Sequence, residues 1–437
     1  MIKKESFKKI KRYSLIVLIF LIFALINTYP LIKHLTTHQL GDGGDGTEFM
    51  WDLWWMKKSL TNLQNPYYTD YLFYPNGSYL YLHTLIPFTG TISIPLQYLF
   101  GNLILVYNIF GNLILVYNII AIINLILAGF SMFLLAFYLT KNKFASIIAG
   151  YIFTFSPYMI GHTLGHLNLM LIWPIPLFIL FFIKFHYEQS FKNMFFPIFF
   201  LILLTLDSLY YGVFMLLFSF IYECFFLLKK FNIKRNYILK LFGIFLIYLL
   251  ILSPLFLGIL SSIFSRKYVG NWDTDYWSAD IFTLFIPGTL AKSKMLFENA
   301  NWWQRIMTNS HAGAENQNFL GYTVLILSII GFITEFKKRK NKNAKNFYLG
   351  FWLILACVGI VFSLGTQLKF LGYIFNVKLP YYYIYKIFPL VSVPGRFILL
   401  TIISLSILSA IGITNLSEYL SKKAKYLFYS IIFLLIF

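Results

Sequence analysis

Residues Phe110 to Leu139 read FGNLILVYNIIAIINLILAGFSMFLLAFYL, and none of these side chains is charged. A helix needs about 20 apolar residues to cross a hydrocarbon layer of about 30 Å, so this run is long enough to span a membrane. Similar runs recur along the 437 residues, of which 59% are hydrophobic and only 12% are charged. Soluble domains contain roughly 25% charged residues. The sequence therefore predicts an all-α polytopic membrane protein.

The basic residues gather in short segments between the apolar runs. Because lysine and arginine favour the cytoplasmic side, these segments predict the topology. They are Lys3 to Arg12, Lys141 to Lys143, Lys184 to Lys192, Lys229 to Lys240, Lys337 to Lys345 and Lys422 to Lys425. The net charge of +20 is explained in this way, so no nucleic-acid partner is predicted. We expect a multi-pass protein of the plasma membrane with a cytoplasmic N-terminus and lipid contact.

Placing every basic segment inside the cell leaves ten spans that alternate in direction. They are expected at Tyr13 to Leu31, Phe110 to Leu139, Phe144 to Ile160, Leu169 to Phe185, Phe195 to Leu209, Val213 to Leu228, Ile238 to Leu260, Leu320 to Phe336, Phe347 to Leu364 and Phe397 to Leu416. The last apolar run begins at Tyr426 and is too short to cross a bilayer, so we expect a truncated eleventh span and a fragment of a longer chain.

The chain is predicted to form a single transmembrane domain (1–437) with three long extracytoplasmic segments. These are 34–108, 261–319 and 365–396. All aspartates fall on the outer side, and aspartate contributes little to orientation, so their placement is an independent check. The segregation favours an outward-facing function, although acidic outer loops alone would also produce it. Residues Phe100 to Ile109 recur identically at Phe110 to Ile119, which indicates a recent duplication or an assembly artefact.

The first outer segment contains GDGGDGTE at Gly41 to Glu48, followed by FMWDLWWMKKSL. Apolar residues at positions 49, 53, 56 and 60 of the second part share one helical face, which predicts an interfacial amphipathic helix. Asp45 and Glu48 fit a capping box at its start. That structural role leaves Asp42 and four glycines unexplained. Carboxylates placed here could instead deprotonate a hydroxyl or bind a cation such as Mg²⁺ or Mn²⁺.

Further polar candidates lie near the outer ends of other spans. His162 and His166 suit one helical face, and they predict hydrogen bonding to a phosphate or sugar, a metal pair, or packing alone. Asp207 lies beside Tyr210 at the turn between two spans, where it either binds substrate or caps the next helix. Arg396 stands before the tenth span, where it either clamps a phosphate or snorkels to lipid headgroups. Glu315 of the second outer segment completes the substrate-binding candidates.

Four stretches carry a resemblance to a known family. They are GDGGD at 41–45, NPYYTDYLFYPNG at 65–77, FSPY at 155–158 followed by GHLN at 165–168, and PGRF at 394–397. In order and topology they resemble bacterial and archaeal multi-spanning glycosyltransferases of the GT-C class, over residues 15 to 416. The resemblance implies a polyprenyl-phosphate sugar as donor and an acidic residue of the first outer loop as catalytic base. That base would be Asp45 or Asp42.

The resemblance also implies an inverting displacement in which the lipid phosphate leaves. Arg396, His162 and His166 could then stabilise the leaving phosphate. An outward-facing site has no access to cytosolic nucleotide sugars, so a lipid-linked donor is the natural source. The sugar, the acceptor and the metal requirement stay open. Two alternatives remain, a lipid or sugar transporter or flippase, and a non-catalytic membrane assembly protein.

Overall fold

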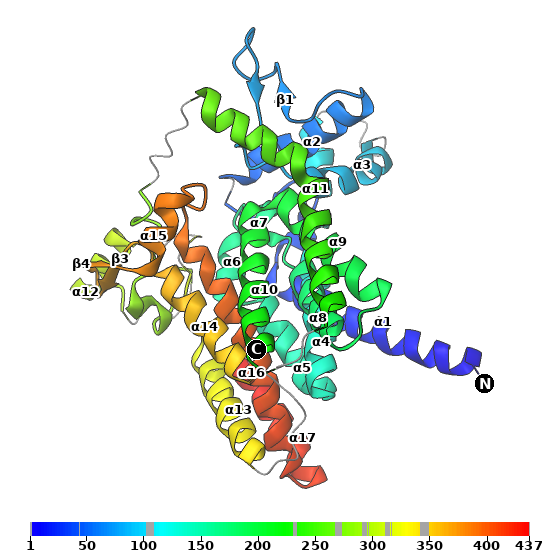
Figure 1. Cartoon of the computed structure of the whole chain (residues 1–437), viewed down its shortest axis with the longest axis vertical. Helices are drawn as coiled ribbons and strands as arrows, with labels where there is room; N and C mark the ends of the chain where they lie inside the picture. The colour runs from blue at the N-terminus through cyan, green and yellow to red at the C-terminus, as the bar shows by residue number, and fades with distance from the viewer. Residues whose placement is uncertain are drawn as a thin grey trace. The chain divides into compact units, whose positions relative to one another are not determined.

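A computed structural model describes residues 2–42, 44–101, 109–229, 234–266, 273–290, 295, 297–310, 315, 317–340 and 349–436. These residues are mostly helical (Figure 1). They form two compact units, each described by itself below. Unit 1 comprises 1–128, 162–215 and 232–269, and unit 2 comprises 129–161, 216–231 and 270–437. Most of the first duplicated copy, 102–108, lies outside the described residues.

The elements of unit 1 come from the first half of the chain and from α11. They are α1 (Ile2–Asn27), η1 (Leu31–Lys33), α2 (Gly46–Thr61), β1 (Tyr68–Thr69), β2 (Ser78–Tyr79), α3 (Pro87–Gly101), the first part of α4 (Ile109–Thr140), α7 (Leu167–Met170), α8 (Pro174–Tyr187), α9 (Phe191–Asp207), the first part of α10 (Leu209–Lys229) and α11 (Arg235–Arg266). Within this unit α9 packs against α8, α11 and α3, and α2 packs against α3.

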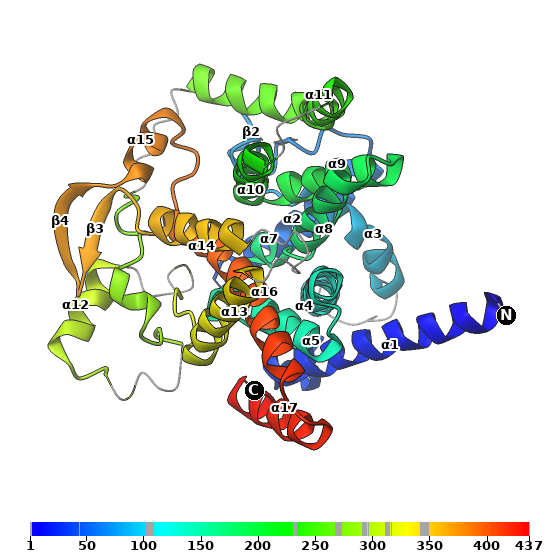
Figure 2. The ribbon, with the colours of Figure 1, turned by 60° about the horizontal axis from the view of Figure 1, so that its bottom comes forward.

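Unit 2 contains the ends of α4 and α10 together with most of the C-terminal half. Its other elements are α5 (Lys143–Thr154), α6 (Pro157–His162), η2 (Ile281–Leu284), α12 (Asn301–Asn309), α13 (Tyr322–Lys340), α14 (Leu349–Ser363), β3 (Gln367–Phe370), β4 (Tyr373–Lys378), α15 (Pro380–Ile387), η5 (Pro394–Phe397), α16 (Ile398–Glu418) and α17 (Lys422–Ile436). The sequence did not predict the two antiparallel hairpins, β1–β2 and β3–β4. The second of these is visible in Figure 2.

Six helical segments in the described part of the chain are long and apolar enough to cross a membrane. They are Ile10–Asn27, Leu113–Thr140, Leu167–Tyr187, Leu209–Leu228, Arg235–Ser265 and Pro394–Glu418. Two shorter apolar helices, Lys143–Thr154 and Leu349–Ser363, accompany them. All ten predicted spans coincide largely with helices, but the count of ten stays a prediction. The structure is that of a largely α-helical membrane protein.

The amphipathic helix predicted after the acidic loop is α2, but protein covers its apolar face. Phe49, Leu53 and Met56 are all at most 2% exposed. The side chain of Met56 lies against Gly90 of α3, and the Gln97 amide donates to the Leu53 carbonyl at 2.8 Å. Protein and not lipid therefore covers this face, and the interfacial position of the helix stays a prediction. The periodicity correctly located the face but could not identify what covers it.

The core of unit 2 is α16, which packs against α13, α14 and α5. Glycines allow the closest of these approaches: a Cβ added at Gly331 would overlap the carbonyl of Leu408, and one at Gly412 would overlap the carbonyl of Leu327. Small residues at helix contacts let backbones approach closely in membranes, where van der Waals packing drives association. Ser328 and Ser409 add a buried hydrogen bond of 2.9 Å between the same two helices.

We expect Gly331→Ala and Gly412→Ala each to destabilise unit 2 by about 1–3 kcal/mol, because the added methyl groups force α13 away from α16. Gly243→Ala in α11 is the matched control, since no atom outside its own helix lies within 4 Å of the new methyl. Thermal unfolding of the purified variants in detergent measures the difference. Equal melting temperatures for all three variants would contradict the packing argument.

Candidate functional site

Two loops of unit 1 lie backbone to backbone at the start of α2. Gly41, with φ of +123°, adopts a conformation that other residues avoid, and a Cβ there would overlap the carbonyl of Leu164. A Cβ at Gly165, with φ of +156°, would lie 3.1 Å from the amide nitrogen of Gly46. The Asp42 amide donates to the Leu164 carbonyl at 3.1 Å. The glycines of the acidic motif thus allow the acidic loop to contact the loop that carries His166.

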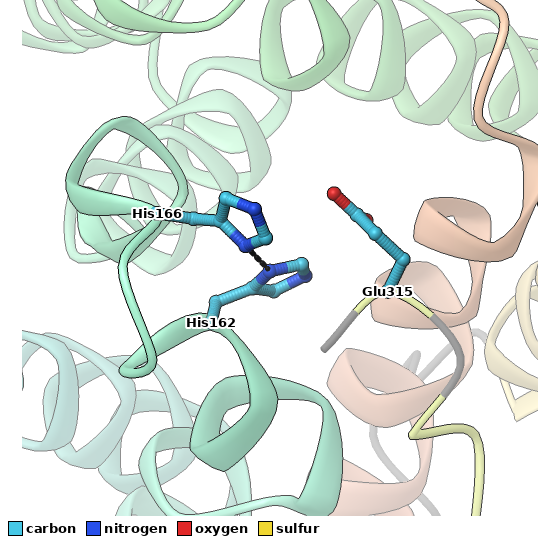
Figure 3. Close-up of side chains that lie close together, drawn as sticks. All are labelled: His162, His166 and Glu315. Atoms are coloured by element: carbon cyan, nitrogen blue, oxygen red, sulfur yellow. Dashed lines mark hydrogen bonds between the residues drawn. The ribbon is translucent and has the colours of Figure 1, made fainter. Parts of the chain in front are cut away.

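This contact brings together three residues predicted from the sequence. Asp45 Oδ2 lies 3.1 Å from His166 Nε2. His166 Nδ1 lies 3.0 Å from His162 Nδ1, and Figure 3 shows this histidine pair. A carboxylate only accepts hydrogen bonds, so His166 donates from Nε2, and in its neutral form it accepts at Nδ1 from His162. The Asp45 side chain is 62% exposed and that of His166 is 15% exposed, whereas His162 is fully buried. The three side chains therefore form a series of hydrogen bonds that runs from the buried His162 to the exposed carboxylate of Asp45.

The predicted capping box is not formed. Asp45 directly precedes α2, but its side chain makes no capping hydrogen bond. Glu48 accepts a hydrogen bond from Thr84 at 2.6 Å and does not reach back to the helix start. The reason is that both carboxylates face partners from other segments, whose hydrogen bonds replace the local ones. Capping therefore does not account for these two acids.

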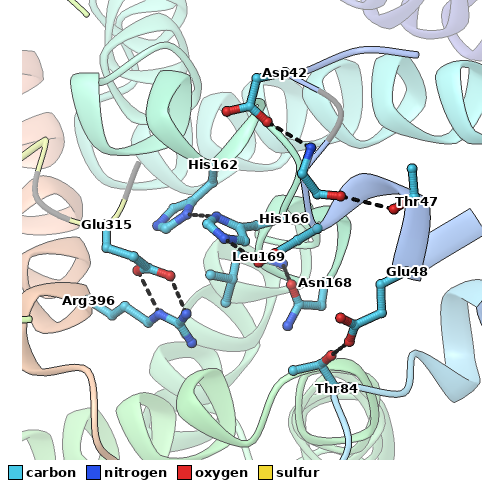
Figure 4. Close-up of polar contacts among 12 residues, drawn as sticks. Asp42, Thr47, Glu48, Thr84, His162, His166, Asn168, Leu169, Glu315 and Arg396 are labelled. Carbon is cyan, nitrogen blue, oxygen red and sulfur yellow. Dashed lines mark hydrogen bonds and ion pairs between the residues drawn. The ribbon is translucent and has the colours of Figure 1, made fainter. Parts of the chain in front are cut away.

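Asp42 has a local role that distinguishes it from Asp45. Its Oδ1 accepts from the amide of Gly44 at 3.1 Å, and the Thr47 hydroxyl donates to the Gly44 carbonyl at 3.1 Å (Figure 4). Such bonds between a side chain and the backbone shape a tight turn. Asp42 is also exposed. It orders the loop that leads into α2, whereas Asp45 is oriented by a histidine.

Buried polar side chains hold the two loops in place. Asn118 of α4 is fully buried; it accepts from the Leu40 amide and donates to the carbonyls of Leu35 and His38, each at 2.8 Å. On the other side, the hydroxyl of buried Tyr211 donates to the Leu169 carbonyl at 2.6 Å and so fixes α7, which begins next to His166. The loops that carry Asp45 and His166 are thus held in place by side chains of α4 and α10.

A second acid–histidine group lies further along α2, and sequence reasoning missed it. His83 Nε2 is 2.9 Å from Asp52 Oδ1, and His83 Nδ1 is 3.6 Å from Glu48 Oε1. The sequence spacing indicated part of this group, because Asp45, Glu48 and Asp52 lie at i, i+3 and i+7 and therefore share one helical face. The sequence offered no sign that His83, 31 residues after Asp52, would meet this face.

The surroundings of Asp52 favour its protonated form. Asp52 is fully buried, and its Oδ2 atom has no hydrogen-bond partner among the residues that the structure describes. Burial raises the pKa of this carboxyl to about 6, and the hydrogen bond and charge of His83 only partly oppose that rise. Burial alone lowers the pKa of the His83 imidazole, but the hydrogen bond to Asp52 and the charges of Asp52 and Glu48 outweigh it, so this pKa is raised.

The remaining candidates of unit 1 have structural surroundings. Asp207, at the end of α9, accepts hydrogen bonds from the amides of Phe88 and Thr89 and from the Thr89 hydroxyl. It thereby caps the start of α3 from another helix. Tyr210 is half-buried and forms an edge-to-face ring pair with Phe214, with centroids 6.3 Å apart.

Two of the predicted substrate-binding residues, Glu315 and Arg396, belong to unit 2 and bind each other. The guanidinium of Arg396 forms a bidentate pair with the carboxylate of Glu315, with Arg396 Nε 2.9 Å from Glu315 Oε2 (Figure 4). Both side chains are largely buried, at 13% and 6% exposed. Arg396 therefore does not simply snorkel to lipid headgroups. To hold a phosphate it would have to exchange a carboxylate oxygen for a phosphate oxygen.

The acidic loop does not gather a three-carboxylate cation site. Within the described residues, Asp42, Asp45 and Glu48 do not bring three ligand atoms together around one point. Asp42 contacts the backbone, Asp45 contacts His166, and Glu48 contacts Thr84. The binding of Mg²⁺ or Mn²⁺ by this loop therefore stays a prediction from the sequence, because Mg²⁺ can be held by one or two carboxylates and water.

Comparison with known proteins assigns the chain to a family. Residues 66–436 match the model of DUF6311, a domain of unknown function. The chain belongs to the DUF6311 family. No curated protein matches the chain. The matched region contains His83, His166 and Arg396, whereas Asp42, Asp45, Glu48 and Asp52 precede it.

Because of the Asp52–His83 pair, we predict that the free energy of unfolding falls as the pH rises. Both groups have raised pKa values, so the folded protein binds their protons more tightly than the unfolded chain does. This stabilisation is complete below pH 3.8, the pKa of the Asp52 carboxyl in the unfolded chain. It is lost as the pH rises through about 6, the pKa of Asp52 in the folded protein, and then through the raised pKa of His83. We expect the melting temperature in detergent to fall by several degrees between about pH 4 and pH 8.

Asp52→Asn should flatten this dependence, because it removes one titrating group and the partner of the other. Asp70→Asn, which changes an exposed carboxylate in the same segment, is the matched control and should leave the slope unchanged. Melting curves of the three proteins over this pH range provide the measurement. An unchanged slope in Asp52→Asn would show that the pair does not titrate as described.

Proposed function

We propose that this protein is a GT-C glycosyltransferase that moves a sugar from a polyprenyl-phosphate donor to an acceptor hydroxyl on the extracytoplasmic side. The observation that carries the proposal is the exposed Asp45 carboxylate held by His166. A general base must be accessible to the hydroxyl and must be oriented by its surroundings. Asp45 meets both requirements, and Asp42, whose Oδ1 accepts from the Gly44 amide, serves the turn instead.

In the proposed reaction the acceptor hydroxyl gives its proton to the Asp45 carboxylate. The hydroxyl oxygen attacks the anomeric carbon of the donor, and the bond from that carbon to the phosphate oxygen breaks. The bonding electron pair leaves with the polyprenyl phosphate, and the configuration inverts because the hydroxyl attacks from the face opposite the leaving phosphate. His166 positions Asp45, and His162 positions His166 through the bond between their Nδ1 atoms.

The family resemblance and the polar outer loops support the class of donor. A site on the outer side has no nucleotide sugars within reach, whereas a lipid-linked sugar can be carried across the membrane first. Phosphate binding by Arg396 stays a prediction from the sequence, for which the chemical reason is that a planar guanidinium binds phosphate and carboxylate in the same bidentate way. In the structure the guanidinium of Arg396 is bound by the carboxylate of Glu315.

We expect Asp45→Asn to lower sugar transfer by about 10²–10⁴-fold, the usual contribution of a general base. His166→Gln should lower it less, because the carboxylate remains but loses its orientation. The measurement is transfer by purified protein in lipid vesicles, assayed with a panel of radiolabelled polyprenyl-phosphate sugars. Asp70→Asn is the matched control and should transfer sugar at the rate of the unaltered protein.

Each contrary result has a defined meaning. Full activity in Asp45→Asn with loss in Asp42→Asn would transfer the role of base to Asp42. Full activity in both variants, or no transfer from any donor by the unaltered protein, would exclude the proposed reaction. A transporter or an assembly protein would give the second result.

The proposed orientation can be tested separately. With Cys224 and Cys357 replaced by serine, a single cysteine at Asp70, an exposed position of the first outer segment, should react with a membrane-impermeant maleimide added to intact cells. A cysteine at Lys141, which is also exposed, should react only after the cells are opened. The opposite pattern would place the acidic loop in the cytosol and remove the basis for a lipid-linked donor.

A further inference from the structure

Unit 2 contains a cavity of about 440 Å³ that the proposed reaction does not use. Its walls come from the end of α5 and the residues after it, from the start of α13, from α16 and from the end of α17. Apolar side chains dominate these walls. They include Ile152, Phe155, Leu320, Val324, Ile402 and Leu405.

The cavity reaches membrane depth. Ile402 and Leu405 belong to the candidate span Pro394–Glu418. At a helical rise of 1.5 Å per residue they lie roughly 12 and 16 Å from the end of that span at Pro394. The hydrocarbon layer is about 30 Å thick, so this wall lies well inside it. Water is therefore not the natural filling of the cavity, because apolar cavities do not hold it.

The cavity adjoins surface that faces outward from the protein. Tyr322 and Leu435, which line it, are 56% and 61% exposed, and Ile326, one turn further along α13, is 58% exposed. The hydroxyl of Thr323 donates to the Leu435 carbonyl at 3.3 Å, which joins α13 to α17 beside the cavity. The apolar lining is thus continuous with the exposed apolar faces of these two helices.

Three hydroxyl groups of the lining are directed to protein carbonyls. Tyr322 donates to the Phe285 carbonyl at 2.8 Å, Thr323 donates to Leu435, and Ser156 donates to the Phe153 carbonyl at 3.4 Å. An occupant consequently need not supply polar atoms to satisfy them. A flexible hydrocarbon chain meets the demands of such a site, whereas a sugar or a headgroup would lose hydrogen bonds on entering it.

We propose that this cavity binds an acyl chain of a membrane phospholipid. The phospholipid bilayer is the medium in contact with the outward faces of α13 and α17, and its chains are the hydrocarbon present at the highest concentration there. The chain enters beside Tyr322 and Leu435 and lies against Ile402 and Leu405. The bound chain fills the space between α5, α13 and α16, and its binding does not require glycosyl transfer.

Photolabelling tests this site in the chain of 437 residues. The protein is placed in vesicles that contain phosphatidylcholine with a diazirine in its acyl chain, irradiated, digested and mapped by mass spectrometry. We expect label on the peptides that contain Phe319–Val324 and Ile402–Leu405. Ile402→Trp fills the cavity with a larger side chain and should lower this labelling about tenfold.

Ile329→Trp is the matched control, because Ile329 lies on the exposed face of α13 and is 57% exposed, away from the lining. It should leave the labelling unchanged. Leu405→Phe is a milder way to fill the cavity and should give a smaller decrease, which keeps the test decisive if the tryptophan variant does not fold.

Two results would overturn the proposal. In folded filling variants, labelling equal to that of the unaltered protein would show that the probe contacts only the outer surface. A diazirine-labelled polyprenyl phosphate that labels the same peptides and prevents labelling by the phospholipid would assign the site to the prenyl chain instead.

Discussion

The close approach of two backbones, at Gly41 and at Gly165, is the constraint on which the candidate site depends. A side chain at Gly41 would overlap the carbonyl of Leu164 and push the acidic loop away from the histidine loop. The approach sets the start of α2, and with it the direction in which the helix carries its carboxylates. The bond from His166 to Asp45 is possible only because the two loops touch.

The helix that begins at this contact presents carboxylates in very different surroundings. The side chain of Asp45 is 62% exposed, that of Glu48 is 44% exposed, and Asp52 is fully buried. A histidine stands at each end of the row, His166 beside Asp45 and His83 between Glu48 and Asp52. Only the exposed end can meet a substrate, whereas the buried end joins α2 to the segment before α3. One helical face therefore combines the exposed carboxylate proposed as the base with a buried structural one.

The sequence predicted the helices and the candidate acids because both depend on local patterns. Apolar runs located the membrane helices, and the spacing of Phe49, Leu53 and Met56 located the buried face of α2. Local patterns do not reveal which distant segment covers a face, so α3 was not expected against α2. The pairing of Asp52 with His83 was missed for the same reason. Likewise, the capping box was predicted from spacing, and long-range bonds to His166 and Thr84 replaced it.

The hydrogen-bond partners of each acid separate structural acids from candidates for chemistry. Asp207 accepts from two backbone amides and a hydroxyl at the start of α3. Asp280 of unit 2, also fully buried, accepts from the amides of Phe282, Leu371 and Gly372, and so ties η2 to the turn between β3 and β4. Backbone amides stabilise a carboxylate but cannot accept its proton.

An ion-coupled transporter typically carries a membrane-depth acid that exchanges its proton or its ion, and the amide bonds of Asp207 suit a fixed cap instead. The Asp45 side chain has a histidine as its partner and remains open to solvent, which is the setting that proton transfer requires. The contrast between amide-bound and histidine-bound acids therefore supports the proposed interfacial enzyme over an ion-coupled carrier.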